Sequence, residues 1–388
     1  MIIQTMALLV DAYRELCAKR LFWITMILNS LVVVVFAMVS INENGMKFLI
    51  WQMPADFAGV TITSETMPPG LLYRTMFAAL AVPWWLRWVA VILGLISTAG
   101  MIPDLIQGGT IESVLSRPIG RIRLLLTKFV GGLLFMTLQV FVFSLLVFLV
   151  IGIRGKSWAP EVFLAVPIVV TMFSYLFAVC VLIGLLTRST IAALLLTAVV
   201  WAAIILVNAG DLFSVSIHEN IKAELRLEQA KVDRRERNAT LAILGERNAE
   251  REAEGLEPLE ALDPAPTSSE LEARDIRLPV TKLRVRELEA SESIASRWRR
   301  VIYFVKAVLP KTGETIALLG RWTIDEEEFA RLGAPPPSDD RQRVAQEGSE
   351  ATAEEFDNRP LWWVLGTSFA FVSVVLGIAA LIFRRRDF

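Results

Sequence analysis

The sequence is poor in the residues that build metal sites and catalytic centres. It holds two cysteines, Cys17 and Cys180, and one histidine, His218, among 388 residues. Two thiols imply neither a disulfide framework nor a cysteine cluster, and one histidine excludes a histidine-rich metal site. No convergent carboxylates and no serine-based triad stand out. We therefore expect no catalytic residue, no bound metal and no cofactor.

Long apolar runs are abundant. The chain is 54% hydrophobic with a mean hydropathy of +0.53, which exceeds what the surface of a soluble domain tolerates. A helix of about 20 apolar residues crosses the roughly 30 Å of hydrocarbon in a lipid bilayer. Six runs approach or exceed this length: residues 21–41, 84–102, 129–153, 162–186, 190–207 and 361–383. We therefore predict an all-α polytopic membrane protein with six transmembrane helices.

Basic residues in the short loops predict the orientation of these spans. With the N-terminus in the cytosol, eleven lysines and arginines lie inside and five outside. An even number of spans then returns the C-terminus to the cytosol, at a cell (inner) membrane. Six tryptophans fall at the predicted outer boundary, where such side chains anchor spans: Trp84, Trp85, Trp88, Trp158, Trp362 and Trp363.

The first twenty residues do not resemble a cleavable signal peptide. They carry Asp11, Arg14 and Glu15 and lack a compact apolar region before a small-residue cleavage site. We predict an amphipathic helix at the membrane interface over residues 1–20. A simple cytosolic segment leading into the first span is the alternative.

Charge is distributed unevenly along the chain. Residues 211–360 hold 31 acidic and 23 basic residues, a net charge of −8, whereas the remainder holds 9 acidic and 16 basic residues, a net charge of +7. The predicted topology places this acidic block outside, as an insertion over residues 209–360. Spans one to five then occupy residues 21–208, and residues 361–388 form the sixth span with a cytosolic tail.

The insertion has the composition of a helical hairpin. Residues 217–254 contain no proline and predict one helix on the order of 50 Å long, and a second helix is expected over residues 269–309. A partly disordered acidic insert is the alternative. Residues 334–358, with three consecutive prolines, predict a flexible tether. In the other external segment, residues 47–51 and 57–63 are expected to pair as strands, and residues 71–82 are too short to span.

Two motif matches do not carry a function. Gly155-Lys156-Ser157 ends like a phosphate-binding loop, but Val150 stands where that loop has its first glycine, so we expect no ATP binding there. Residues 309–313 spell a cell-wall sorting signal, Leu-Pro-Lys-Thr-Gly. More than forty mostly polar residues separate it from the next apolar run, whereas a sorting signal lies almost directly before one. We interpret this match as chance.

The clearest functional signal lies between the second and third apolar runs, in the predicted cytosolic loop 103–128. Thr110 or Ser113 can cap a short helix that Pro118 must end or redirect. Basic side chains, among them Arg117 and Arg121, then face the cytosol beside the membrane. A helix of this kind can fit a groove on a soluble partner. The alternative is a positively charged loop that sets topology and binds anionic lipid.

This loop resembles the coupling segment of ABC-2 type permeases, the ATP-binding-cassette exporter group that includes permeases of nitrous-oxide-reductase maturation and of bacterial gliding. The family pattern is Gly-Thr, three variable residues, Leu-Leu-Ser, one variable residue, Pro-Val/Ile and Ser-Arg. Matching positions here are Gly109, Thr110, Leu115, Ser116, Pro118, Ile119 and Arg121. Val114 and Gly120 depart from the pattern, and the family's glutamates before Gly109 are missing. The ending, residues 383–388, also resembles the family's.

The resemblance implies a permease subunit that has no ATPase activity of its own. Its expected partners are a cytosolic ABC ATPase subunit and a second permease copy or paralogue. The ATPase-coupling interface is expected at Gly109, Thr110, Glu112, Leu115, Ser116, Arg117, Pro118, Arg121 and Lys128. The function implied is export of a substrate, or mechanical work across the membrane. A second hypothesis is a membrane scaffold whose hairpin, within residues 211–360, recruits extracytoplasmic protein partners. Neither hypothesis involves nucleic acid.

Overall fold

The computed structural model describes residues 14, 20–43, 45–52, 56–57, 60–61, 68–107, 120–323 and 338–385. Six of its helical segments are long and apolar enough to cross a membrane, which confirms the predicted number of spans. The segments are Arg20–Ala37, Pro69–Ile106, Arg121–Arg154, Pro160–Thr187, Thr190–Ala253 and Trp362–Arg385.

The chain divides into two compact units. The span unit comprises Met1–Asn208, Lys306–Pro335 and Arg359–Phe388, and the insert unit comprises Ala209–Val305 and Pro336–Asn358. Residues 306–323, which the sequence suggested as part of the external insertion, therefore group by their contacts with the spans.

The second span is longer than expected. It runs through α3 (Pro69–Met76), η1 (Phe77–Ala90), α4 (Val91–Thr98), η2 (Ala99–Met101) and α5 (Pro103–Gln107). Residues 71–82, expected to be too short to span, form the first part of it. Proline cannot donate the usual i→i−4 hydrogen bond. The helix continues through Pro83 because η1 is a wider π-helix.

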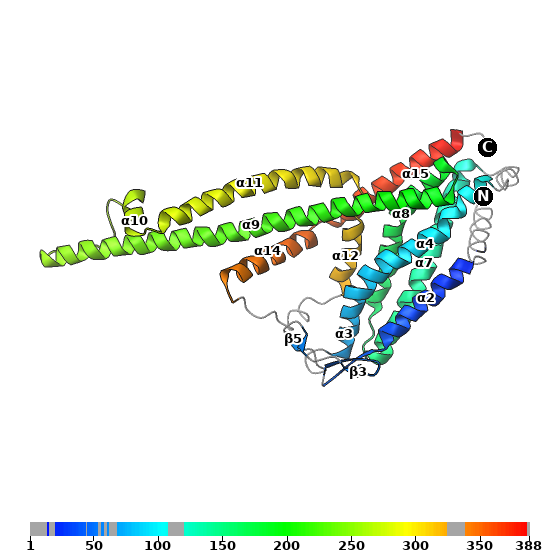
Figure 1. Cartoon of the computed structure of the whole chain (residues 1–388), viewed down its shortest axis with the longest axis horizontal. Coiled ribbons are helices and arrows are strands. Elements are labelled where there is room, and N and C mark those ends of the chain that lie inside the picture. The colour runs from blue at the N-terminus through cyan, green and yellow to red at the C-terminus, as the bar shows by residue number, and fades with distance from the viewer. Residues whose placement is uncertain are drawn as a thin grey trace. The chain divides into compact units, whose positions relative to one another are not determined.

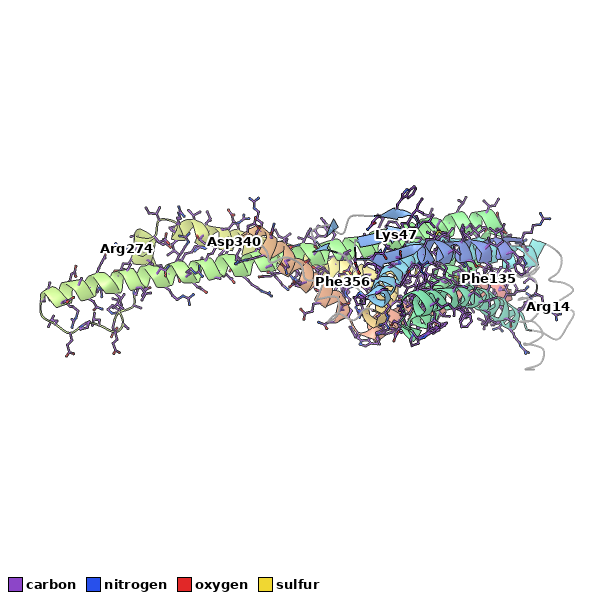
Figure 2. All side chains as sticks on the ribbon, turned by 90° about the horizontal axis from the view of Figure 1, so that it is seen from below. Arg14, Lys47, Phe135, Arg274, Asp340 and Phe356 are labelled. Carbon is purple, nitrogen blue, oxygen red and sulfur yellow. The ribbon has the colours of Figure 1, made fainter. Side chains whose placement is uncertain are left out.

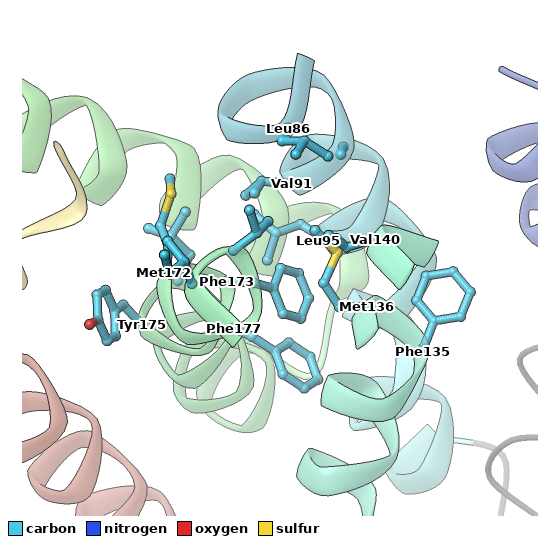
Figure 3. Close-up of a cluster of buried hydrophobic side chains, with 14 of the residues drawn as sticks. Leu86, Val91, Leu95, Phe135, Met136, Val140, Met172, Phe173, Tyr175 and Phe177 are labelled. Atoms are coloured by element: carbon cyan, nitrogen blue, oxygen red, sulfur yellow. The ribbon is translucent and has the colours of Figure 1, made fainter. Parts of the chain in front are cut away.

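The core of the span unit lies between the third and fourth spans, α7 (Arg121–Arg154) and α8 (Ala165–Thr187), the latter preceded by η3 (Pro160–Leu164). Phe173 and Phe177 point from α8 towards α7 (Figure 3), and the ring of Phe177 stacks on that of Phe129 with centroids 5.2 Å apart. A Cβ atom at Gly132 would lie 2.4 Å from the Phe177 ring. Glycine at this position therefore lets the two helices pack closely.

The short strands pair locally. β1 (Val39–Asn42), β2 (Gly45–Phe48) and β3 (Trp51–Gln52) form one antiparallel sheet, and β4 (Asp56–Phe57) pairs with β5 (Val60–Thr61). The predicted pairing of residues 47–51 with 57–63 is wrong. Each segment pairs with its nearest neighbour in the chain, which closes a shorter loop at a lower entropic cost.

The first span is α2 (Arg20–Ala37), and the fifth span is the first part of α9 (Thr190–Ala253). α9 continues without a break past Asn208 into the insert unit, so the expected helix over 217–254 is not a separate element. α11 (Leu278–Val308) lies alongside it (Figure 1), with the short α10 (Ser268–Arg274) between them in the chain. The predicted pair of long charged helices is present, but the helix expected over residues 269–309 is interrupted at residues 275–277, between α10 and α11.

Residues 340–357 are not the expected flexible tether. They form α14 (Asp340–Asp357), and the Asp339 carboxylate caps it by accepting a hydrogen bond of 2.7 Å from the Gln342 backbone amide. Lys231 on α9 lies 3.0 Å from the Asp340 carboxylate at the start of α14. Figure 2 shows charged side chains such as Arg274 and Asp340 projecting from the helices of the insert unit.

Candidate functional site

The predicted coupling segment is only partly covered by the structure. Gly109, Thr110, Glu112, Leu115, Ser116, Arg117 and Pro118 lie outside the described residues. Arg121 and Lys128 are described, and both belong to the first two turns of α7. Seven residues make about two helical turns, so the two side chains share one face of the helix. Both are half-buried.

Arg121 connects the beginning of the third span with the end of the sixth. Its Nη1 atom donates a hydrogen bond of 3.4 Å to the backbone carbonyl of Arg384, one residue before the end of α15 (Thr367–Arg385). The last carbonyls of a helix lack helical partners and carry a partial negative charge, so a cation is favoured there. The end of the sixth span is thereby held beside the exit of the coupling segment.

A second cluster of functional interest lies in the span unit. Glu314 lies in the first turn of α12 (Thr312–Thr323). Its Oε1 atom accepts hydrogen bonds from the Nζ atom of Lys306 and from the Nη1 atom of Arg359. The side chains of Lys306, Glu314 and Arg359 are 2%, 6% and 9% exposed. Lys306 belongs to the last turn of α11, and Arg359 precedes η4 (Trp362–Gly366). We call Lys306, Lys311, Glu314 and Arg359 the Glu314 cluster.

The Lys311 side chain caps the C-terminal end of α11. The amine lies 4.5 Å from the centre of the Trp363 ring, close enough for a cation–π contact, and 2.5 Å from the Thr367 hydroxyl. It also donates to three backbone carbonyls at the end of α11, those of Lys306 at 3.2 Å, Ala307 at 3.4 Å and Leu309 at 3.3 Å. Carbonyls at a helix end lack most of their helical partners, although that of Lys306 also accepts a hydrogen bond of 3.1 Å from the Leu309 backbone amide. These contacts explain how a lysine is accommodated with no exposed surface.

The first turn of α12 also contacts the fourth and fifth spans. The Thr315 hydroxyl lies 3.3 Å from the Tyr175 hydroxyl, and the Asn208 amide donates to the Thr312 hydroxyl at 3.3 Å. Tyr175 leaves α8 on the side opposite to Phe173 and Phe177 (Figure 3). The Glu314 cluster is therefore linked to α8 and α9 as well as to the sixth span.

The chemistry of this arrangement is structural. Within the residues that the structure describes, no group of three or more His, Cys, Asp or Glu side chains is placed to hold a metal ion. The Glu314 cluster consists mostly of cations around one carboxylate, which does not resemble a metal site. Its geometry holds two positions of the chain, Lys306 and Arg359, next to the beginning of α12.

Sequence reasoning missed the Glu314 cluster, although a signal was present. Lys306 stands alone in an otherwise apolar run, residues 301–309, and such a lysine near a membrane marks a functional position with a partner. The net charge of residues 211–360 predicts an external insertion that includes residues 306–320. Net charge alone does not indicate which of these side chains are buried.

Six apolar helices with buried polar contacts between them define a multi-pass membrane protein of helical spans. The family model described as ABC-2 family transporter protein matches residues 6–244, which is 239 of 388 residues. The chain belongs to this family of transporter permeases, and the predicted resemblance is confirmed. The family has no catalytic activity of its own, in agreement with the expectation from the sequence. No curated protein and no solved structure shows a significant match.

Proposed function

We propose that the protein is the permease subunit of an ABC exporter. It couples ATP hydrolysis by a separate cytosolic ATPase subunit to the export of a substrate, or to mechanical work across the membrane. The single observation that carries this proposal is the family match over residues 6–244, which includes the whole predicted coupling segment. The working unit pairs the chain with a second copy or a paralogue. Both termini lie in the cytosol, and the insert unit lies outside.

The coupling interface consists of the nine residues from Gly109 to Lys128 that the sequence singles out. Arg121 and Lys128 share a face at the beginning of α7, and Arg121 bonds to the end of α15. A displacement of the coupling segment therefore moves the third and the sixth span together. Acidic side chains or backbone carbonyls of the ATPase contact Arg121 and Lys128.

The Glu314 cluster gives the spans a route to the insertion. Movement of α8 displaces Thr315 through Tyr175, and movement of the sixth span displaces Lys311 through Thr367. Thr315 lies in the first turn of α12, and Lys311 directly precedes this helix. Glu314 in this turn holds Lys306, the residue at which the chain leaves α11 for the span unit.

Copurification tests the proposal. Arg121→Glu replaces attraction by repulsion and is expected to cost about 2 to 5 kcal/mol of association with the ATPase, which lowers complex formation by more than about tenfold. Arg154→Glu, which reverses a charge at the other end of α7, is the matched control and should capture the ATPase like the wild type. Both variants should reach the membrane in normal amounts.

Full ATPase capture and transport-linked hydrolysis by Arg121→Glu would remove the coupling assignment. Absence of any ATPase from the wild-type protein in mild detergent would favour the scaffold hypothesis, in which the insert unit recruits extracytoplasmic partners.

A further inference from the structure

An apolar groove lies inside the insert unit, between α9 and α11. It has a volume of about 490 Å³, within the range of small-molecule sites. Apolar side chains dominate both walls, with serine hydroxyls as the polar exceptions. The lining residues are Gly210, Phe213, Ser214, Ile217, Ile221, Ser291, Ile294, Ala295, Trp298 and Ile302.

The α9 wall of the groove continues the exposed apolar face of the fifth span. Successive residues of a helix are turned by about 100°, so positions separated by 4, 7 or 11 residues lie on one face. Five exposed apolar side chains on α9 have these spacings: Leu195, Val199, Leu206, Phe213 and Ile217, with exposed fractions between 38% and 74%. The first three belong to the span, where such a face contacts lipid.

The distance along α9 places the groove at the membrane surface. From Thr190, where α9 begins, the helix rises about 30 Å to Gly210 and about 46 Å to Ile221. The hydrocarbon layer is about 30 Å thick, and the head-group regions extend the bilayer to about 40 to 45 Å. A tilted helix stays in the membrane over even more residues. The groove therefore spans the level of the head groups.

The α11 wall has the side chains typical of a membrane interface. An exposed apolar stripe follows the helix at Ile294, Trp298, Val301, Val305 and Val308, with exposed fractions between 50% and 73%. Within one turn of Trp298, Arg297 and Arg300 are also exposed. Tryptophan and arginine together mark the boundary at which a side chain buries its apolar part and keeps its polar end at the head groups.

Farther along α9 from the fifth span, α9 and α11 contact each other through ion pairs. Glu224 on α9 lies 2.8 Å from Arg284 on α11, and Glu236 lies 2.9 Å from Lys282. At the outer end of the pair, Ala239 on α9 packs with Leu271 and Leu278 in a separate buried apolar cluster. The groove is therefore the apolar part of the seam that lies nearest the fifth span, and ion pairs separate it from the outer cluster.

We infer that this groove binds the hydrocarbon chain of a phospholipid from the leaflet in which α9 leaves the membrane, with the phosphate close to Arg297 and Arg300. A lipid fits better than a second copy of the chain because the groove continues a stripe that begins inside the bilayer. This site does not depend on the proposed transport function. Its role is to keep the base of α9 and α11 at the membrane surface.

Photocrosslinking of the purified full-length protein in lipid nanodiscs tests the site. The probe is phosphatidylglycerol with a diazirine in the acyl chain. Mass spectrometry is expected to find the label on residues 210–221 and 291–302, and on the exposed face of α7 around Phe141. Ala295→Trp fills the groove and should lower labelling of residues 291–302 several-fold, with labelling of α7 unchanged. Ala290→Trp, on the same helix outside the lining, is the matched control.

Two results would overturn the inference. One is wild-type protein labelled on α7 and on neither wall of the groove, a result that requires no variant to fold. The other is unchanged labelling of residues 291–302 in Ala295→Trp. If the walls are unlabelled and Trp298→Cys, in a chain without Cys17 and Cys180, forms disulfide-linked pairs, a second copy occupies the groove instead of a lipid.

Discussion

The two units use ion pairs in opposite ways. In the span unit, Glu314 is almost fully buried and binds two cations from distant parts of the chain. In the insert unit, Glu219 has a 9% exposed side chain, but pairs such as Glu224 with Arg284 have side chains that are 36% and 51% exposed. Water screens these exposed pairs, so each contributes little. A buried cluster pays a large desolvation penalty, and losing one partner leaves charges buried without that contact. The span unit therefore depends on single residues, and the insert unit on the sum of many.

The sharpest test of this contrast is Glu314→Gln. It keeps the shape of the side chain and removes the negative charge that Lys306 and Arg359 both contact. We expect a loss of about 3 to 5 kcal/mol, measured as thermal unfolding of the purified protein in detergent. Glu347→Gln, at an exposed position of α14, is the control and should unfold like the wild type. Equal unfolding temperatures for the two variants would contradict the structural role of the cluster.

A second test compares how tightly the units are packed. Gly132→Ala places a Cβ atom against the buried, stacked ring of Phe177 and should destabilise the span unit by about 1 to 3 kcal/mol. Gly245→Ala in the insert unit meets nothing within 4 Å, and alanine favours a helix, so this variant should be neutral or slightly more stable. The same thermal unfolding measurement applies. A neutral Gly132→Ala would mean that α7 and α8 are free to separate.

The exposed pairs should respond weakly. Arg284→Ala removes the contact with Glu224 and should lower the free energy of unfolding by about 0 to 1 kcal/mol. High salt should reduce the difference further, since it screens exposed charges. A loss as large as that of Glu314→Gln would remove the distinction between the two units.

The smallest effect is expected from acid. Asp275, between α10 and α11, has a pKa held below its usual value of 3.8, first by the hydrogen bond from the Arg277 backbone amide and then by Arg235. The stability that this carboxylate adds is present above pH 3.8 and is lost as the pH falls towards its folded pKa. The protection of backbone amides at the α10–α11 junction against hydrogen exchange should therefore fall below that pH in the wild type. In Asp275→Asn this protection should be lower already at neutral pH and change less with acid, and identical pH profiles of protection would refute this.

Periodicity and composition predicted the number of spans and the two long helices. A run of about twenty apolar residues, or a charge-rich stretch without proline such as residues 217–254, leaves few other structures. These predictions failed where the rule that prolines end helices and mark flexible segments did not hold. Pro83 reads as a helix boundary, yet η1 passes it as a π-helix. Residues 340–357 look like a tether after three prolines, but Asp339 caps a helix there. The Glu314 cluster was hidden because charge in a sequence gives no information on burial. The coupling role of all nine residues from Gly109 to Lys128 remains a prediction.

The burial of Pro310 and Lys311 has a consequence for the sorting-signal match. Here Thr312 and Gly313 begin α12, and Lys311, Thr312 and Thr315 have no exposed surface. Access to the Thr312–Gly313 bond requires that the end of α11 separate from Thr367 and Ser368. The folded protein is therefore protected from processing at this motif, and cleavage there would report that the region had unfolded.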